Sequence, residues 1–308
     1  MKKELLLVKF PFMFPIIYGF VLYVFPTYEN HLIFLTILLL AETHFAATWP
    51  FFLNKVNQSY IKIKKVNLIY IPILIILFSL LGFFLFKNLF FLIFFLINIF
   101  HVTRQSYGIS SLYCKNLEEK KFHEFFIYLF SFVFFLIAFF RFYLPLIPKE
   151  YLLNLNIVMI SIFFLVISYY IKKFKFSEKT LILITGCLIF YPACFVSNPV
   201  HFIIMGVTMH YTQYLYLTNH VFKKRRDQLN NEEKSNKYLK YFFIIAAYSA
   251  IMSLLSMAGK YDESIFKNLL IIPIVGQMLH FYLDSQLWKF SIEHNRKNIL
   301  SHLKELIN

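Results

Sequence analysis

The sequence predicts an all-α protein that crosses a membrane about ten times. Of its 308 residues, 59% are apolar and 15% are charged, whereas soluble domains carry about 25% charged residues. The apolar residues are gathered in runs of roughly twenty, the length that a helix needs to cross a hydrocarbon core of about 30 Å. The lysines and arginines lie mainly in every second loop between these runs. These three observations indicate a polytopic helical membrane protein.

The expected helices follow one another along the chain and are joined by short polar loops. Pro11, Pro15 and Pro273 are expected to kink the first and the last of them. All of them belong to one transmembrane domain, residues 1–308. The apolar runs cover residues 5–25, 31–54, 67–86, 88–107, 123–146, 152–171, 180–197, 200–222, 239–258 and 264–290.

The loop charges predict the direction of the chain in the membrane. Loops on one side carry 24 lysines and arginines, and loops on the other side carry 5. Because basic residues stay on the cytoplasmic side, both termini are expected in the cytoplasm. Residues 223–240 are expected to form a basic cytoplasmic loop that also meets anionic membrane lipid. A composition rich in phenylalanine, lysine and isoleucine and poor in glycine is typical of an AT-rich genome, so we expect a bacterial cytoplasmic membrane.

Several function classes are excluded by what the sequence lacks. It contains no G-x-G-x-x-G and no P-loop, so nucleotide chemistry is not expected. A net charge of +15 would suggest nucleic acid as a partner of a soluble protein, but here the basic residues set the topology. No two histidines lie three or four residues apart, which excludes the histidine boxes of membrane desaturases. The chain also lacks D-D-x-x-D and G-x-S-x-G motifs.

Four histidines lie in the middle of apolar runs, where polar groups are costly and usually face a partner or a cavity. Each has small or polar residues three or four positions away, which places them on one helix face. Small residues also allow close helix packing, so these faces should point into the bundle. The four groups are Ala41, His44 and Thr48; Asn98, His101 and Gln105; Gly206, His210 and Gln213; and Gln277, His280 and Asp284.

The expected depth of these histidines in the membrane is a second, independent indication that they lie together. All four lie in even-numbered runs, which are expected to point toward the cytoplasm. Each precedes the next basic anchor by 9 to 14 residues. At 1.5 Å per residue, those offsets correspond to roughly 14 to 21 Å. The sequence therefore predicts four imidazoles in one layer of the membrane.

Clustered neutral imidazoles suit iron, with zinc and copper as alternatives. The predicted metal ligands are His44, His101, His210, His280 and Asp284. Glu42 and Gln105 are expected to act as further ligands or to hold an imidazole N–H. Arg104, Gln213 and Gln277 are expected to orient a substrate or a carboxylate. The alternative interpretation is that each histidine only forms a hydrogen bond between helices.

Haem is not favoured as the cofactor. His280 and His294 lie fourteen residues apart, the spacing of two haem ligands on one helix, but no second pair repeats it. His294 is also expected outside the bilayer.

The layout of isolated histidines in several spans resembles the Brp/Blh family of membrane carotene oxygenases. In that family, intramembrane histidines hold a non-haem iron that cleaves a hydrophobic polyene with dioxygen. The resemblance implies that His44, His101, His210 and His280 are iron ligands and that the substrate is a lipid or polyene. An electron donor would be a further partner. The chain departs from the family in one respect, since two of the family's ligands lie one turn apart on a single helix.

A transporter is the alternative from a different functional class. The same polar layer would then bind an ion, a proton or a metal during alternating access. The histidine-bearing runs form the second members of four helix pairs, which suggests repeated hairpins. All even-numbered runs point the same way, however, so the inverted symmetry common in transporters is not evident. A third reading is a structural protein, in which removing a histidine changes only stability.

Overall fold

The computed structural model describes residues 2–53, 55–227, 231–261 and 265–307. In these residues the chain is helical and forms no strand, which confirms the all-α prediction. The chain divides into two compact units. The first unit is Met1–Glu29 with Ile99–Tyr216, and the second is Asn30–Asn98 with Leu217–Asn308.

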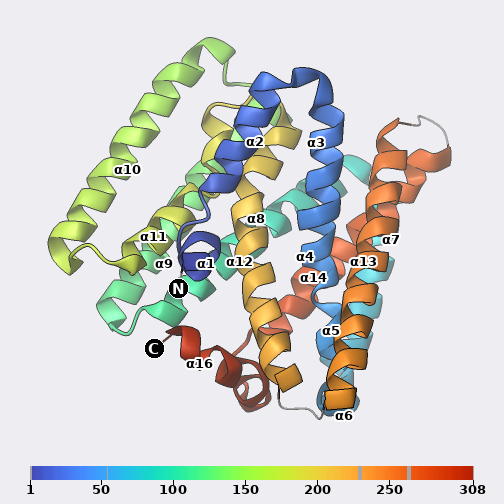
Figure 1. Cartoon of the computed structure of the whole chain (residues 1–308). Helices are drawn as coiled ribbons and strands as arrows, with labels where there is room; N and C mark the ends of the chain where they lie inside the picture. The colour runs from blue at the N-terminus through green and yellow to red at the C-terminus, as the bar shows by residue number, and fades with distance from the viewer. Residues whose placement is uncertain (1, 54, 228–230, 262–264, 308) are drawn as a thin grey trace. The chain divides into compact units, whose positions relative to one another are not determined.

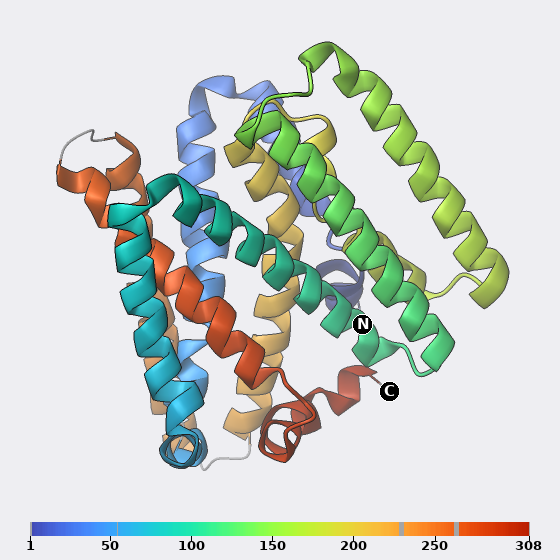
Figure 2. The ribbon, with the colours of Figure 1, turned by 180° about the vertical axis from the view of Figure 1, so that it is seen from behind.

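The first unit contains a hairpin of long helices, α9 and α10, which run side by side (Figure 2). Aromatic pairs join them, such as Phe130 with Phe163. The helix α11 packs against both of them. The elements are α1 (Lys2–Glu4), a π-helical segment (Leu5–Lys9), α2 (Met13–Val24), the end of α8 (Lys87–Tyr113), α9 (Leu117–Ala138), a π-helical segment (Phe139–Tyr143), α10 (Leu152–Phe174), α11 (Glu178–Leu188) and the start of α12 (Pro199–Asp227). Short 3₁₀ turns lie at Pro26–Tyr28, Lys149–Tyr151 and Tyr191–Cys194.

The second unit places α14 against α7 and α4, while α13 packs on α4 (Figure 1). Phe83, Phe90, Ile271 and Ile274 form one of its apolar clusters. The elements are α3 (Glu29–Thr36), a π-helical segment (Ile37–Ala41), α4 (Glu42–Ala46), α5 (Trp49–Phe52), α6 (Lys55–Ile63), a π-helical segment (Val66–Tyr70), α7 (Ile71–Leu85), the start of α8, the end of α12, α13 (Asn231–Tyr261), a 3₁₀ segment (Ile265–Leu270), α14 (Ile271–Leu287), α15 (Glu293–Asn295), a π-helical segment (Arg296–Leu300) and α16 (Ser301–Ile307).

Local sequence explains where several helices begin. Asn116 caps α9 because its side chain accepts a hydrogen bond of 2.9 Å from the backbone N–H of Glu118. Ser177 and Thr180 form a capping box at the start of α11. Lys173 at the end of α10 forms an ion pair with Glu118 at the start of α9, so these two ends lie together.

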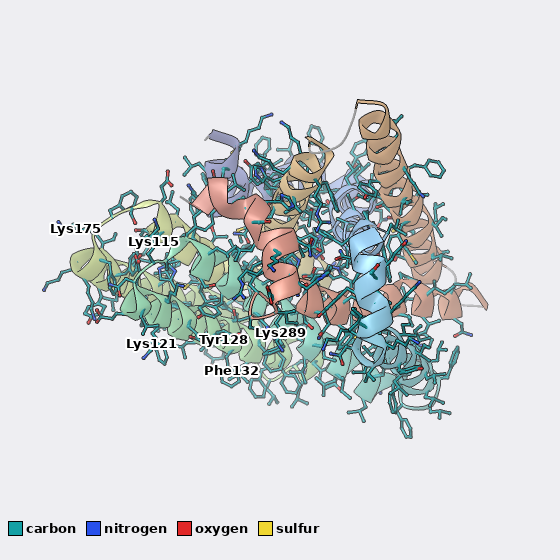
Figure 3. The ribbon with its side chains drawn as sticks, turned by 90° about the horizontal axis from the view of Figure 1, so that it is seen from below. Lys115, Lys121, Tyr128, Phe132, Lys175 and Lys289 are labelled. Carbon is teal, nitrogen blue, oxygen red and sulfur yellow. The ribbon has the colours of Figure 1, made fainter. Side chains whose placement is uncertain are left out.

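The same end of the first unit is rich in lysine. Lys115, Lys121 and Lys175 mark it in Figure 3, where Phe132 lies farther along α9. Phe132 is exposed, as are many apolar side chains of α10. Exposed apolar side chains on long helices are what a lipid-facing surface requires.

Six helices in the described part of the chain are long and apolar enough to cross a membrane. They confirm the coarse prediction of a polytopic membrane protein. Their bounds agree closely with six of the expected runs. The six are Pro26–Phe52, Val66–Leu85, Lys87–Tyr113, Leu117–Tyr143, Leu152–Phe174 and Leu239–Gly259.

The other four expected runs are broken or more polar, each for a visible reason. The run 5–25 is interrupted at Phe10–Phe12, because Pro11 has no N–H to continue the helix. The run 180–197 ends its α-helix at Leu188, whose carbonyl would need an N–H from Pro192. In the run 200–222, α12 is long but carries many polar residues. The run 264–290 starts as a 3₁₀ segment before α14, and its first residue lies outside the described part.

Most of the expected loop 223–240 is helical in the structure. The helix α12 continues to Asp227, and α13 begins at Asn231. Residues 228–230 lie outside the described part. The basic residues of this stretch therefore extend two helices rather than a long loop.

Candidate metal centre

His44 lies in an irregular part of the first long span of the second unit. A π-helical segment, Ile37–Ala41, precedes it, and the Thr43 hydroxyl donates to the carbonyl of Leu38 at 2.8 Å. After His44 the helix turns at Ala47 and Thr48, because Pro50 cannot donate to the carbonyl of Ala46. π-Helical segments inside helices occur frequently at functional sites. A helix irregularity of the kind found at functional sites therefore lies close to His44 in the sequence.

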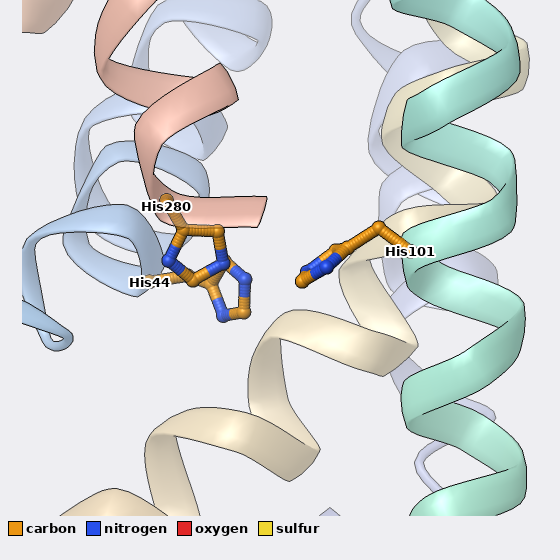
Figure 4. Close-up of side chains that lie close together, drawn as sticks. All are labelled: His44, His101 and His280. Carbon is orange, nitrogen blue, oxygen red and sulfur yellow. The ribbon is translucent and has the colours of Figure 1, made fainter. Parts of the chain in front are cut away.

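His44 on α4 and His280 on α14 lie next to each other in the second unit (Figure 4). Their ring centroids are 4.5 Å apart at 66°, and both side chains have 0% exposure. A ligand nitrogen of one lies within 4.8 Å of a ligand nitrogen of the other. Two nitrogens bound at about 2.1 Å to one ion lie no more than about 4.2 Å apart. The pair is thus close to the geometry of two ligands of one metal.

Thr48 holds the His280 ring. Its Oγ1 lies 2.7 Å from Nδ1 of His280, and both residues are fully buried. When Nδ1–H donates to this hydroxyl, Nε2 is the ring nitrogen that carries the lone pair. Such a hydrogen bond on the second ring nitrogen is the usual partner of a metal-binding histidine.

Two buried carboxylates accompany this pair in the second unit. Gln277 Nε2 lies 3.5 Å from Oε1 of Glu42, and Oε2 of Glu42 has no hydrogen-bond partner among the described residues. Asp284 accepts a hydrogen bond of 2.8 Å from the indole N–H of Trp288, the residue that directly follows α14. Both carboxylates are only 1% exposed. Two acidic side chains are thus withdrawn from water close to the histidine pair.

The first unit contains a second pair, His101 on α8 and His210 on α12. Their ring centroids are 5.8 Å apart and the planes are nearly perpendicular, at 87°. Both rings are buried. The helix α12 also approaches the end of α11 closely, since a Cβ on Gly206 would lie 2.0 Å from the backbone carbonyl oxygen of Ile189. The sequence prediction that Gly206 marks a close approach is thereby confirmed.

The three other predicted site residues of the first unit have different surroundings. Gln213 is buried, and its Nε2 donates to the backbone carbonyl of Val8 at 2.6 Å, which fastens the amino-terminal segment. The amide nitrogen and oxygen of Gln105 are buried with no hydrogen-bond partner in the described part of the chain. Arg104 is exposed and lies near the hydroxyl of Tyr128. Gln105 is therefore better placed than Arg104 to receive a polar ligand.

A second group of metal-binding residue types lies in the first unit. Cys114, Glu119 and His123 are all buried, and their ligand atoms lie within 4.8 Å of one another. The apolar pattern of the sequence does not mark this group, because each residue alone is unremarkable. The signal that was available is the i, i+4 spacing of Glu119 and His123 on α9, with the cysteine just before the helix.

His201 is a further buried histidine, and hydrogen bonds satisfy both of its ring nitrogens. Nδ1 lies 2.7 Å from the hydroxyl of Tyr18, and Nε2 lies 2.9 Å from Oε1 of Glu29. Both nitrogens are occupied within the first unit, so the ring is held as a structural link between α2 and α12.

No family model, curated protein or solved structure matches this chain. The function is therefore inferred from the chemistry of its own residues.

Proposed function

We propose that this protein is an integral membrane metalloenzyme that uses buried imidazoles to hold iron and oxidises a hydrophobic substrate. The observation that carries the proposal is the pair His44 and His280, two fully buried rings with ligand nitrogens within 4.8 Å. The hydroxyl of Thr48 on Nδ1 of His280 supports it, because a hydrogen bond on one ring nitrogen is the usual arrangement of a metal-binding histidine.

The remaining ligands are proposed from the sequence. It puts His101 and His210 at the same depth as His44 and His280, so the proposal assigns all four imidazoles to the metal, with Asp284 as a further ligand. Iron is the proposed ion, and zinc or copper are the alternatives for such a donor set. Bound iron would supply redox chemistry with dioxygen.

The neighbouring polar residues are proposed to position the reactants. Glu42 and Gln105 have buried polar atoms without hydrogen-bond partners in the described part, which suits groups that meet a ligand. Gln277 lies beside Glu42 and would hold that carboxylate in place. Gln213 and Arg104 are the weaker candidates for positioning a reactant, because the Gln213 amide donates to Val8 and Arg104 is exposed.

The substrate is proposed to be a lipid or polyene that enters from the membrane. The apolar composition and the exposed apolar faces of the long helices support this class, because such a substrate reaches a buried site without crossing water. An electron donor is the proposed protein partner. The proposed location is the cytoplasmic membrane of a bacterium, with ten spans and both termini in the cytoplasm, on the evidence of the loop charges.

Metal analysis of detergent-purified protein tests the proposal. We expect near-stoichiometric iron in the wild type and at least a tenfold loss in His44→Ala and in His280→Ala. His31→Ala is the matched control, because His31 is exposed, and it should keep its iron. Thermal unfolding of each variant separates loss of metal from loss of fold. A wild type that binds no iron, zinc or copper after reconstitution would overturn the proposal.

A transporter is the second candidate, and one observation favours it. The first long span is interrupted on both sides of His44, by the π-helical segment Ile37–Ala41 and by the turn at Ala47 and Thr48. Interrupted helices form the ion sites of many transporters. Metal or proton flux into proteoliposomes, abolished in His280→Ala, would favour this candidate. Oxygen consumption dependent on an added lipid would favour the enzyme.

A further inference from the structure

The connection between α8 and α9 brings three different ligand types together within ten residues. The helix α8 ends at Tyr113, Cys114 follows it directly, and α9 begins after the Asn116 cap. Glu119 and His123 then lie one turn apart on the same face of α9. The exposed fractions of Cys114, Glu119 and His123 are 2%, 4% and 0%. Three groups that bind metals well are thus withdrawn from water at one place.

The distances fit a small coordination sphere. The sulfur of Cys114 lies 3.9 Å from Nδ1 and 4.0 Å from Nε2 of His123. Around a tetrahedral zinc ion with bond lengths of about 2.3 Å to sulfur and 2.1 Å to nitrogen, these atoms would lie about 3.6 Å apart. A carboxylate oxygen of Glu119 is within 4.8 Å of both ligand atoms. Because the sulfur is almost equally far from both ring nitrogens, direct ligation through Nε2 requires the His123 ring or the Cys114 side chain to rotate.

Neighbouring groups bond Nδ1 of His123 and both carboxylate oxygens of Glu119. Ser110 Oγ lies 2.5 Å from Nδ1 of His123, which leaves Nε2 for an ion when Nδ1 carries the proton. Tyr170 donates to Oε1 of Glu119 at 2.7 Å, and Lys179 donates to Oε2 at 2.6 Å. A carboxylate has about four lone-pair positions, so two remain after these bonds.

We propose that Cys114, Glu119 and His123 form a zinc site in the first unit, with water as the fourth ligand. A thiolate and a carboxylate balance the two positive charges of the ion. The ammonium of Lys179 stays on the other carboxylate oxygen, and its side chain is 34% exposed, so water solvates its charge. Binding displaces the thiol proton of Cys114 to the solvent. This site is separate from the proposed iron ligands and contains the sulfur that they lack.

Cobalt substitution of the full-length protein in detergent tests this proposal. Co²⁺ bound to a thiolate gives a near-ultraviolet charge-transfer band, whereas a site of imidazoles and carboxylates gives none. We expect the band in the wild type and in His280→Ala, and at least a tenfold smaller band in Cys114→Ser. The matched control is the double variant Cys187→Ser, Cys194→Ser, since both cysteines are equally buried and it should keep the band.

A measurement on the wild type alone guards against a variant that fails to fold. Zn²⁺ should slow alkylation of Cys114 at least tenfold and should leave the rates of Cys187 and Cys194 unchanged. A wild type without the cobalt band, a band that survives in Cys114→Ser, or alkylation that Zn²⁺ does not slow would each overturn the zinc site. None of these results depends on iron binding, so the two proposals fail separately.

Discussion

Oγ1 of Thr48 lies 2.7 Å from Nδ1 of His280, although 232 residues separate them in the sequence. Thr48 directly precedes α5, at the turn that Pro50 imposes on the first long span. The same turn that breaks the helix after His44 therefore fixes the neighbouring imidazole. A helix interruption and a histidine orientation have one cause.

Replacement of Thr48 by valine should weaken metal binding. Valine has nearly the same shape as threonine but no hydroxyl, so Nδ1 of His280 loses the partner that orients the ring. Loss of such a partner typically costs about 10- to 100-fold in metal affinity. Metal titration of the purified protein measures the change. Thr43→Val is the control, because the Thr43 hydroxyl bonds Leu38 and Ser249 and no histidine. Equal affinities in the two variants would contradict the proposed role of Thr48.

Replacement of Gly206 by alanine should destabilise the first unit. A Cβ there would lie 2.0 Å from the carbonyl oxygen of Ile189, which is backbone and cannot rotate away. Overpacking of this kind costs about 1–3 kcal/mol. Gly108→Ala is the matched control, since a Cβ at this helical glycine meets nothing within 4 Å. Thermal unfolding in detergent should show a lower midpoint for Gly206→Ala, while Gly108→Ala stays at or slightly above the wild type.

The fold was predictable where long apolar runs are uninterrupted. All six long apolar helices follow from run length, and the interruption at Pro11 follows from the missing N–H. The helix α11 ends early because Pro192 also lacks an N–H. Hydrophobicity alone does not predict this end, because Ile189 and Phe190 continue the apolar run. The π-helical segments have no comparable sequence signal, because an i to i+5 hydrogen bond needs no special residue type.

Removal of the Gln213 side chain should release the amino-terminal segment. Its Nε2 donates to the carbonyl of Val8, and Val8 is fully buried. Loss of this bond leaves a buried carbonyl unsatisfied, which costs about 1–3 kcal/mol. Hydrogen exchange at residues 5–9 should become at least tenfold faster in Gln213→Ala. In the control Gln58→Ala it should not change, because Gln58 is exposed and lies in the second unit. Unchanged exchange in Gln213→Ala would show that other contacts hold the segment.

Residues 293–303, here called the carboxyl-terminal tail, should dock less tightly in mild acid. His294 stacks on Tyr60 with ring centroids 3.9 Å apart, and its Nε2 donates to Oδ1 of Asn57 at 2.7 Å. The Asn57 amide is oriented by its own donation to the carbonyl of Phe51, so Nε2 of His294 carries the donated proton. Burial, and then the positive charge of Arg225, lowers the pKa of His294. Protonation therefore opposes this contact.

The sign of the pH effect follows from that lowered pKa. Above the ordinary histidine value of about 6.5, both the docked and the released tail hold a neutral His294, and docking is at full strength. As the pH falls below that value, the released tail binds the proton more readily and docking is progressively lost. Hydrogen exchange of residues 293–303, measured from pH 7.5 to 5.5, should show this progressive loss of docking. The dependence of docking on pH should be weaker in His294→Phe, because phenylalanine keeps the stacking on Tyr60 but cannot bind a proton. His302 accounts for the dependence that remains, because its pKa is lowered too. An unchanged dependence in His294→Phe would rule out this origin.

The candidate site was only partly predictable from the sequence. His44 and His280 were singled out because each interrupts an apolar run, and the structure places their rings together. Thr48 was noted only as a small residue on the histidine face, and its bond to His280 depends on the packing of α4 against α14. Cys114, Glu119 and His123 lie at a helix end, where polar residues are common, so nothing in the apolar pattern marks them.

The π-helical segment Ile37–Ala41 sets the angular position of His44. Compared with a regular α-helix, such a segment contains about one additional residue for the same rise, and each residue of an α-helix turns the chain by about 100°. Leu39 is exposed and lies inside this segment. Deleting Leu39 would restore a regular helix and leave the parts before and after it in the same orientation, because the π-helical segment absorbs the additional residue. The two halves of this span are therefore out of phase in the sequence by a single amino acid, and counting α-helical turns from the residues before the segment gives the wrong face for His44.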